Sequence, residues 1–410
     1  MNILFLTLGY YPEPDKRTIY CDLAEEFAKN GHKVYVTCAA PRRGGQTVSP
    51  GTTGGVTVLK INTGGIVKTN IIKKGISAVL LPRRIKKAVK HLYSVKFDLV
   101  LCSTPPVTFA KIIKYIKARD SAATYLMVKD IFPQNAVDLG LLSKTGFKRP
   151  IYLYFRRKER ELYRISDYIG CMSQANADYI LKHNHYLKPS CVEVCPNSIK
   201  IMHPRKPWDA RARAALNLPE DTVIFIFGGN LSKPQGIVFL IQALRLNINK
   251  PDRFFVICGT GTEYKSLQDF IKSERPRNIM LINGLPKQQY NELLSVCDIG
   301  LICLDHRFTV PNFPSRILSY MEFGLPVIAF TDKNTDIRDV LQTGGFGWWR
   351  ESNDAGACTS LLDEICNNRD KIAKRGVKAA EYLEKHYDSE TTYRAIMKHF
   401  ANERDLQGVQ

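Results

Sequence analysis

Short apolar runs alternate with amphipathic stretches along most of the chain. In the first half, runs typical of buried strands occupy residues 3–8, 34–38, 56–61, 99–102, 124–128, 168–172 and 192–195. Apolar residues recur with a helical period over residues 22–29, 81–93, 109–118 and 151–164. Such alternation predicts a parallel sheet with helices on both faces, which is a doubly wound α/β domain.

The same alternation resumes at residue 223 and continues to about residue 375. Three predicted strands here open onto glycine-containing loops: strand 223–227 onto GGNLSKPQG, strand 254–257 onto GTG, and strand 279–282 onto NGLP. Glycine lets the backbone approach a phosphate closely, and the carboxyl ends of parallel strands share one edge of a sheet. These junctions predict a composite ligand site along that edge.

A fourth junction lies in TVPNFPSRILSYMEFGLPVIAFTDKNTD, residues 309–336. Its prolines interrupt regular structure, Ser315 stands where it can cap a short amphipathic helix, and Gly324 ends that helix. The apolar run 327–330 then predicts another buried strand. Alone, this segment is typical of an ordinary αβ unit; with the other three junctions it predicts part of the same site.

Length and composition indicate two globular domains. A chain of 410 residues is too long for one core, and 44% hydrophobic with 24% charged residues are globular values. The polar, proline-containing stretch 197–209 is typical of a linker. We therefore predict an N-terminal domain at 1–200, a C-terminal domain at 201–385, and a terminal helix within 386–410. No stretch approaches the ~20 apolar residues of a spanning helix, and no basic region of a signal peptide is present, so we expect a cytoplasmic protein.

The eleven cysteines are scattered and odd in number, which favours reduced thiols in such a chain. Cys191 and Cys195 are the closest pair, but they lack the usual spacing of zinc ligands and have no second ligand pair nearby. The histidines form no metal motif either. We expect no metal and no cofactor.

The net charge of +20 is large and unevenly placed, because residues 66–97 carry nine Lys or Arg and no acid. A helix opened by Pro82 would place basic and apolar side chains on opposite faces: Arg83, Lys86, Lys87 and Lys90 against Ile85, Val89 and Leu92. A basic amphipathic helix is typical of an anionic membrane surface, although its apolar side can equally pack on the domain core. A second basic cluster spans residues 148–164. Because no nucleic-acid recognition motif accompanies these charges, we expect a membrane partner and no nucleic acid.

The order of the motifs resembles the family 4 glycosyltransferases, which have the GT-B fold. The resemblance runs through ILFLTLGYYPEP, LAEEFAKNGHKVYV, FGGNLSKPQG, ICGTGTEYKSL, INGLPKQQYNELLSVCDIGL and PSRILSYMEFGLPVIA. It implies two Rossmann-like doubly wound domains facing each other across a cleft, with the acceptor bound by the first and the nucleotide sugar by the second. It also implies retention of anomeric configuration and a C-terminal helix that crosses back onto the N-terminal domain. The GN-x-x-x-x-QG loop and PSR block resemble a polysaccharide- and glycolipid-assembly branch that includes aminosugar and fucosaminyl transferases.

Several positions depart from the family pattern. Two glutamates that hold ribose and donor sugar in the family fall on Pro311 and Ser319, and the Arg and Lys of its glycine loop fall on Asn230 and Gln235. We predict that Arg316 and Lys233 supply the cationic charge instead, since a departing diphosphate must be stabilised. A solvent-facing loop lysine is an equal interpretation of Lys233.

The remaining donor-site assignments follow the same resemblance. Ser319 can hydrogen-bond a ribose hydroxyl, and Glu322 is either a substitute carboxylate or an ordinary surface glutamate. The predicted donor-binding residues are Gly228, Gly229, Asn230, Gln235, Gly259, Gly261, Gly284, Leu285, Pro311, Ser315 and Ser319. Catalysis without a divalent metal is expected, because helix N-termini and side-chain cations can serve the phosphates.

Acceptor contacts are expected where strands of the N-terminal half end. Tyr10 and Tyr11 follow the first strand, and Ser103 and Thr104 end the fourth. Asp130, in a segment resembling D-x-x-P-E of the same branch, is the candidate acceptor-side contact or base. A capping or loop aspartate is an equally good interpretation of Asp130.

Two functions from different classes remain at this point. The first is a retaining glycosyltransferase that moves a sugar, UDP-linked, to a lipid-linked or glycan acceptor for cell-surface polysaccharide, at the inner face of the plasma membrane. The second is a catalytically silent GT-B protein that binds nucleotide or glycan within an assembly complex. A nucleotide-sugar epimerase of the same fold fits the basic surface less well. A nicotinamide dehydrogenase is disfavoured because no G-x-G-x-x-G follows a strand near an acidic partner.

Overall fold

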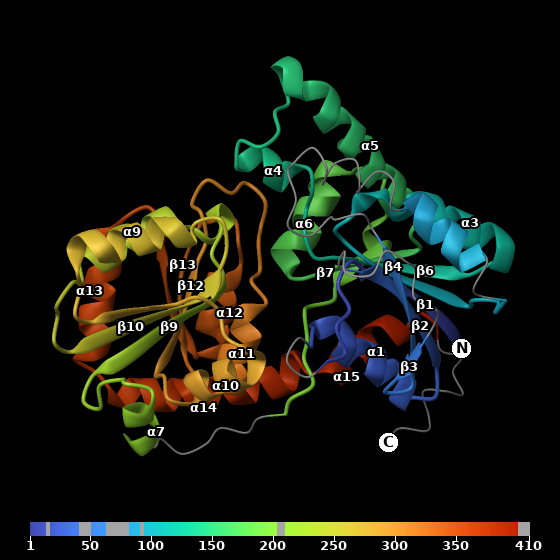
Figure 1. Ribbon diagram of the computed structural model, residues 1–410. Helices are drawn as coiled ribbons and strands as arrows, with labels where there is room; N and C mark the ends of the chain where they lie inside the picture. Colours follow the sequence, from blue (N-terminus) through green and yellow to red (C-terminus); the bar gives the residue numbers. More distant parts are fainter. Residues whose placement is uncertain (14–16, 41–50, 63–81, 91–93, 203–209, 401–410) are drawn as a thin grey trace. The chain divides into compact units, whose positions relative to one another are not determined.

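The computed structural model describes the chain except for residues 14–16, 41–50, 63–81, 91–93, 203–209 and 401–410 (Figure 1). The chain divides into two compact units. Unit 1 consists of Met1–Lys200 with Ser389–Gln410, and unit 2 of Ile201–Asp388. Each unit is a parallel sheet with helices on both faces, which confirms the predicted doubly wound α/β class.

Unit 1 is built on an eight-stranded sheet in the order β3-β4-β2-β1-β5-β6-β7-β8. Every pair is parallel except β3 with β4. The strands are β1 (Asn2–Leu6), β2 (Lys33–Ala40), β3 (Gly51–Thr53), β4 (Val56–Asn62), β5 (Leu99–Ser103), β6 (Ala123–Val128), β7 (Tyr168–Cys171) and β8 (Val192–Val194). The α-helices are α1 (Ile19–Lys29), α3 (Ala110–Asp120), α4 (Gln134–Asp138), α5 (Arg149–Ile165), α6 (Gln174–His183) and α15 (Ser389–Met397). Residues 82–90 are also helical.

The central strands of unit 1 are buried along almost their whole length because both faces of the sheet are covered. All five residues of β5 are buried, as are five of the six in β6. The prediction from the apolar runs is therefore confirmed for the strands. It omitted α4, α6 and β3, which are short or weakly periodic.

Two helices follow one another near the C-terminal end of the described chain, and the second lies within the range 386–410. α14 (Asp370–His386) ends before Tyr387, and α15 starts at Ser389, whose N–H donates to the carbonyl of Ile199 at 3.0 Å. α15 then packs on α1: the ring of Tyr393 lies 4.9 Å from that of Phe27. The hydrogen bond from Ser389 to Ile199 coincides with the break between α14 and α15.

Unit 2 has a six-stranded, wholly parallel sheet in the order β11-β10-β9-β12-β13-β14. The strands are β9 (Val223–Asn230), β10 (Arg253–Thr260), β11 (Ile279–Ile282), β12 (Ile299–Cys303), β13 (Val327–Thr331) and β14 (Gly347–Glu351). The helices are α7 (Ala210–Ala215), α8 (Ile237–Arg245), α9 (Tyr264–Glu274), α10 (Lys287–Ser295), α11 (Arg316–Glu322), α12 (Ile337–Gly344), α13 (Ala355–Cys366) and α14. The strand order reverses between β9 and β12, and ligands of such sheets bind at the carboxyl end of that switch point.

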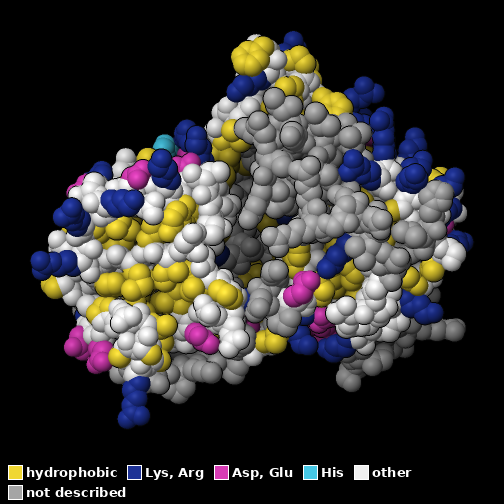
Figure 2. Space-filling model, viewed as in Figure 1, with side chains coloured by type: hydrophobic (Ala, Val, Ile, Leu, Met, Phe, Trp, Pro, Cys, Tyr) yellow, Lys and Arg dark blue, Asp and Glu magenta, His cyan; other side chains and the backbone are white. Residues whose placement is uncertain are grey.

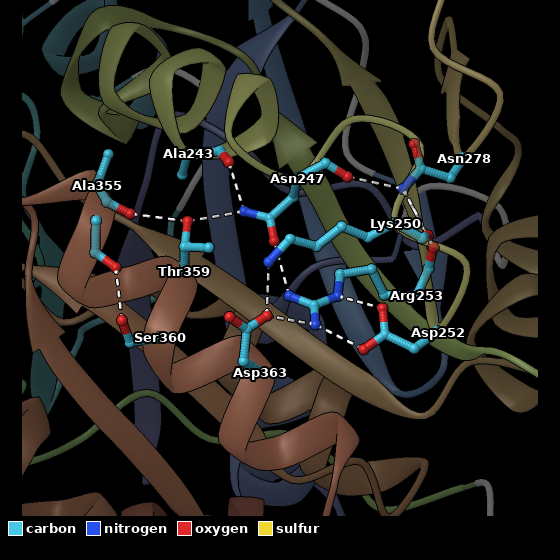
Figure 3. Close-up of polar contacts among 11 residues, drawn as sticks. Ala243, Asn247, Lys250, Asp252, Arg253, Asn278, Ala355, Thr359, Ser360 and Asp363 are labelled. Atoms are coloured by element: carbon cyan, nitrogen blue, oxygen red, sulfur yellow. Dashed lines mark hydrogen bonds and ion pairs between the residues drawn. The ribbon is translucent and has the colours of Figure 1, made fainter.

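A buried polar cluster holds the opposite end of this sheet together (Figure 3). Arg253, at the start of β10, has a side chain only 1% exposed. Its guanidinium donates to Asn247 at 2.7 Å and pairs with Asp252 and Asp363, both at 2.6 Å. Asn247 in turn donates to Thr359 at 2.9 Å. These contacts join β10, the segment after α8, and α13, so the cluster is structural.

Candidate active site

The glycine segment of unit 2 continues strand β9 instead of turning away from it. The sequence predicted that the strand ends at Phe227, but β9 reaches Asn230 and stays paired with β10 as far as Asn230 beside Thr260. The loop then begins at Leu231, makes a single 3₁₀ turn at η5 (Lys233–Gln235), and enters α8 through Gly236 with φ of +58°. The strand is longer than predicted because the glycines pair well in this close strand contact.

The glycines of this edge let neighbouring loops approach one another. A Cβ on Gly259 would lie 1.9 Å from the carbonyl oxygen of Gly229, and one on Gly261 would lie 2.1 Å from that of Leu231. A Cβ on Gly228 would lie 1.8 Å from the hydroxyl of Tyr290. Each glycine therefore has a packing reason that does not involve a ligand. Their contact with a donor, like that of Gly284 and Leu285, remains a prediction.

Arg316 is the polar centre of this edge. Its guanidinium lies over the ring of Phe227, 4.4 Å from the ring centroid, and donates to the side-chain oxygen of Gln235 at 2.6 Å. The same nitrogen lies 3.5 Å from the carbonyl oxygen of Asn230. A Cβ on Gly229 would lie 3.9 Å from the guanidinium. The structure thus brings three predicted donor-site residues, Gly229, Asn230 and Gln235, together around one cation.

One nitrogen of Arg316 is left without a partner. Its Nη1 is buried and makes no hydrogen bond within the described part of the chain. A buried N–H that lacks an acceptor is costly, so such groups usually have an explanation in function or in an unseen ligand. A phosphate oxygen would satisfy this donor and would form the forked contact that guanidinium favours.

Lys233 lies in the η5 turn, two residues before Gln235. Its side chain is exposed, and no ion pair involves it among the described residues. Both interpretations of this lysine, a ligand contact and a solvent-facing loop residue, are compatible with that position.

The segment around α11 differs from its prediction in two respects. Ser315 occupies the N-cap position, but its side chain makes no capping hydrogen bond, so the predicted cap is wrong. Glu322 accepts the N–H of Met202 at 2.9 Å, which gives this carboxylate a structural role. Ser319 lies one turn after Arg316 on the same face of the helix and is half-buried, whereas Pro311 is buried.

Two tyrosines of this edge were missed by the sequence analysis. The hydroxyl of Tyr320 accepts the N–H of Gly228 at 3.0 Å and donates to the carbonyl of Leu301 at 3.1 Å. Tyr290 covers Gly228 from α10. Both side chains pack against the glycine segment at Gly228, and burial raises the pKa values of the two hydroxyls. In the sequence, a tyrosine on the apolar side of a helix looks the same whether it supports the glycine segment or simply packs in the core.

The corresponding edge of unit 1 holds the predicted acceptor-side residues. Tyr10 is only 1% exposed, and its hydroxyl has no partner within the described residues. Ser103 is buried and donates to Thr7 at 3.2 Å. The Thr104 hydroxyl donates to the carbonyl of Asp130 at 3.1 Å and accepts the N–H of Lys129 at 3.0 Å. Tyr10, Ser103 and Thr104 therefore pack and position this edge, and their direct contact with an acceptor remains a prediction.

Asp130 and Tyr11 are the better placed candidates. The Asp130 carboxylate makes no hydrogen bond to the described residues, and burial raises its pKa to about 6. Tyr11 is half-buried, and burial also raises its pKa. A carboxyl group with a pKa near the operating pH can accept or donate a proton in catalysis.

Two features are absent from the part of the chain that the structure describes. No group of three or more His, Cys, Asp or Glu side chains could hold a metal ion in the described ranges. No helix there is both long and apolar enough to cross a bilayer.

Comparisons with known proteins agree with this architecture. Residues 18–201 match the model of Glycosyltransferase Family 4, and residues 209–382 match that of Glycosyl transferases group 1. The chain is 26% identical over 285 residues to the probable glycosyltransferase WbjE of Pseudomonas aeruginosa, covering 67% of this chain and 69% of that protein. It is 21% identical over 320 residues to the putative colanic acid biosynthesis glycosyl transferase WcaI of Escherichia coli, covering 76% and 74%.

Solved structures show the same fold over the full length. Sucrose-phosphate synthase from Thermosynechococcus elongatus aligns with a TM-score of 0.76 at 14% identity, covering 100% of both chains. Anabaena HepE, in complex with UDP and glucose, aligns with a TM-score of 0.68 at 16% identity, covering 97% of this chain and 98% of that one. Both halves of the chain thus match the two halves of one enzyme class. The chain belongs to the family 4 glycosyltransferases and has the GT-B fold.

Proposed function

We propose that the protein transfers a sugar from a UDP-sugar to a lipid-linked or glycan acceptor during synthesis of a cell-surface polysaccharide, with retention of configuration. The observation that carries this proposal is the unpaired, buried Nη1 of Arg316 at the switch point of unit 2. HepE was solved with UDP and with UDP-glucose, and WbjE and WcaI are named as glycosyltransferases, WcaI of colanic acid. These relatives support a nucleotide-sugar donor and a polysaccharide product.

In the proposed reaction, unit 2 stabilises the departing diphosphate. Arg316 would donate from Nη1 to a phosphate oxygen while Gln235 holds its other nitrogen, and Lys233 would add a mobile point charge. Ser319 would donate to a ribose hydroxyl in place of the family's carboxylate. Because side-chain cations can carry the negative charge, we expect full activity in EDTA; activity lost to the chelator and restored by magnesium or manganese would contradict this.

In unit 1, Asp130 would act on the acceptor. At neutral pH a carboxyl with a pKa of about 6 is mostly ionised and can take the proton of an attacking hydroxyl. Thr104 would fix the Asp130 backbone through its two hydrogen bonds.

The proposal also places the protein in the cytoplasm, peripherally bound to the inner face of the plasma membrane. In helix 82–90, Ile85 and Val89 are fully buried, so the apolar side packs on the core of unit 1. Arg83, Lys87 and Lys90 are exposed, and Lys86 lies over the ring of Tyr115 at 4.6 Å. Leu92 lies outside the described residues. Charge therefore carries the proposed attraction of this helix to anionic lipid.

The test combines binding and turnover. UDP-, GDP- and dTDP-sugars are screened by thermal shift, and hydrolysis or transfer of each binding donor is then measured with Arg316→Gln and a control, Arg338→Gln. Arg338 also lies over an aromatic ring, Trp349 at 5.2 Å, but belongs to α12. A UDP-sugar that binds and turns over, and whose turnover falls only in Arg316→Gln, supports the proposal. Binding without turnover would support the silent protein instead.

A further inference from the structure

Large apolar side chains are exposed in one short segment of unit 1. Among the described residues, twelve large hydrophobic side chains are exposed, and five of them lie between positions 141 and 154. They are Leu141 (57%), Phe147 (89%), Ile151 (50%), Leu153 (48%) and Tyr154 (38%). Such a concentration of exposed apolar surface marks an interaction site.

This segment forms a projection on unit 1. α4 and the first half of α5 extend beyond the body of the unit 1 sheet (Figure 1), and apolar and basic side chains lie side by side on the projection (Figure 2). The buried residues of α5 are all in its second half: Glu159, Leu162 and Tyr163. The first half is held by the ring of Phe155, which lies 4.9 Å from that of Phe132. Its outer apolar side chains are exposed in the described part of the chain.

A basic groove runs along the base of the projection. It has a volume of about 1220 Å³ and is enclosed by the start of helix 82–90, by α3 and by α5. Its lining includes eight Lys or Arg and one acid, Glu161. Glu161 is paired with Lys158 at 2.7 Å. Six cations have no ion-pair partner among the described residues: Arg83, Lys111, Lys114, Arg157, Arg160 and Arg164.

We propose that the projection is a membrane anchor: Phe147 and Ile151 enter the headgroup boundary of an anionic bilayer while the basic groove binds lipid phosphates. The two chemistries occur together at a bilayer surface, where apolar side chains reach acyl chains and cations meet phosphate. A free phosphate would leave the apolar tip unexplained. A second copy of a chain with net charge +20 would bring two cationic surfaces together.

The inference deepens the membrane location proposed above, on which it rests, by naming the element that inserts. Vesicle binding is measured without donor or acceptor. Its failure would therefore leave the proposed sugar transfer standing, and a protein without transferase activity could still bind vesicles.

The first experiment is co-sedimentation of the full chain with vesicles of phosphatidylcholine alone or mixed equally with phosphatidylglycerol. We expect binding to the anionic vesicles and a loss of about tenfold or more in Phe147→Ser with Ile151→Ser, since burial of each side chain is favourable. The matched control is Val238→Ser with Leu246→Ser, two exposed apolar positions of unit 2, for which we expect no change. Equal losses in both pairs, or none in the first, would overturn the proposal.

Charge-reversal variants test whether the basic groove binds anionic lipid. Arg157→Glu with Arg160→Glu should weaken binding to anionic vesicles and reduce its salt dependence, whereas Lys272→Glu with Arg277→Glu changes net charge equally on an exposed surface of unit 2. Insertion itself is read with Phe147→Trp, whose emission should shift to shorter wavelength with anionic vesicles; Val238→Trp should not shift. The same weakening from both charge pairs, or no shift for Phe147→Trp, would contradict the proposal. So would concentration-dependent dimers in light scattering that Phe147→Ser abolishes without any vesicle binding, because a second copy would then cover the tip.

Discussion

The carboxyl edges of the two sheets share a parallel topology but hold opposite charges. In unit 2 the edge is centred on a cation, Arg316, whose Nη1 lacks a partner in the described chain. In unit 1 the hydroxyls of Ser103 and Thr104 are satisfied internally, and the group without a hydrogen bond is the carboxyl of Asp130. Under the proposed function, the first edge would bind an anionic diphosphate and the second would take the proton of a neutral hydroxyl. A few side chains at strand ends thus give two edges of the same topology different chemistry.

We expect the largest effect for a substitution of Arg253, an arginine that lies at the opposite end of the unit 2 sheet from Arg316 and should affect stability, not donor binding. Arg253 in unit 2 is buried with its partners in place, unlike Arg316. Arg253→Leu should lower the free energy of unfolding by about 3–5 kcal/mol, because it leaves buried Asn247 without its donor and Asp252 without its cation, while Asp363 keeps only Lys250. Urea denaturation measures this. A stable Arg253→Leu protein with weakened donor binding would reverse the roles given to the two arginines.

Arg316→Gln is expected to act on the donor and not on the fold. Loss of a hydrogen bond to a charged group removes about 1.5–3 kcal/mol of interaction, so kcat/KM for the UDP-sugar should fall by about 10- to 150-fold. Steady-state kinetics with Arg338→Gln as control measure it. Unchanged kinetics in a folded Arg316→Gln enzyme would remove the cation from the site.

Asp130 predicts a pH dependence from the other edge. If it accepts the acceptor proton, kcat/KM should fall about tenfold per pH unit below a pKa of about 6, and Asp130→Asn should lose activity at every pH. The affinity of Asp130→Asn for the UDP-sugar should equal that of the wild-type protein. A wild-type profile that is flat between pH 5 and about pH 7 would exclude this carboxyl as the base.

The raised pKa of Asp130 also makes the free energy of unfolding depend on pH. Burial raises the folded pKa to about 6, above the ~3.9 of an unfolded aspartate, so the folded state binds the proton more tightly. The contribution of this proton binding to the free energy of unfolding is fully present below about pH 3.9 and is lost as the pH rises through about 6. Compared with Asp130→Asn, the wild-type protein should therefore become relatively less stable over this interval, as thermal melts at each pH would show.

Lys233→Ala is expected to have the smallest effect. An exposed lysine contributes about 0.2–1 kcal/mol to an ionic contact, which corresponds to at most about a fivefold rise in KM for the donor. High salt should reduce the difference between Lys233→Ala and wild type. A loss as large as that of Arg316→Gln would show that the point charge, and not the forked guanidinium, dominates.

The sequence predicted the fold better than the contacts within it. Apolar runs located most of the strands, because parallel strands are buried on both faces, but β3, β12 and β14 were not predicted. They did not show that β9 continues through Gly228–Asn230, since pairing with β10 overrides the low strand preference of glycine. Nor did they show the break between α14 and α15, which depends on a hydrogen bond from Ser389 to Ile199.

Site residues were predictable by position but not by partner. The sequence placed Arg316 and Gln235 in neighbouring loops, but not in contact, because their pairing depends on how β9 and β12 lie side by side. It placed Tyr10 after the first strand, but could not show that this side chain is buried in the core. The exposed apolar segment at the start of α5 was not predicted from the sequence, because Phe147 and Ile151 resemble core residues in any periodic pattern.

The claim that Arg316 binds the diphosphate is tested most directly by a thermodynamic cycle. Affinities of wild type and Arg316→Gln for UDP and for uridine are measured by calorimetry in EDTA. The account predicts that wild type prefers UDP strongly, that the preference shrinks about tenfold or more in Arg316→Gln, and that uridine binds both proteins equally. The same preference for UDP in both proteins would contradict it.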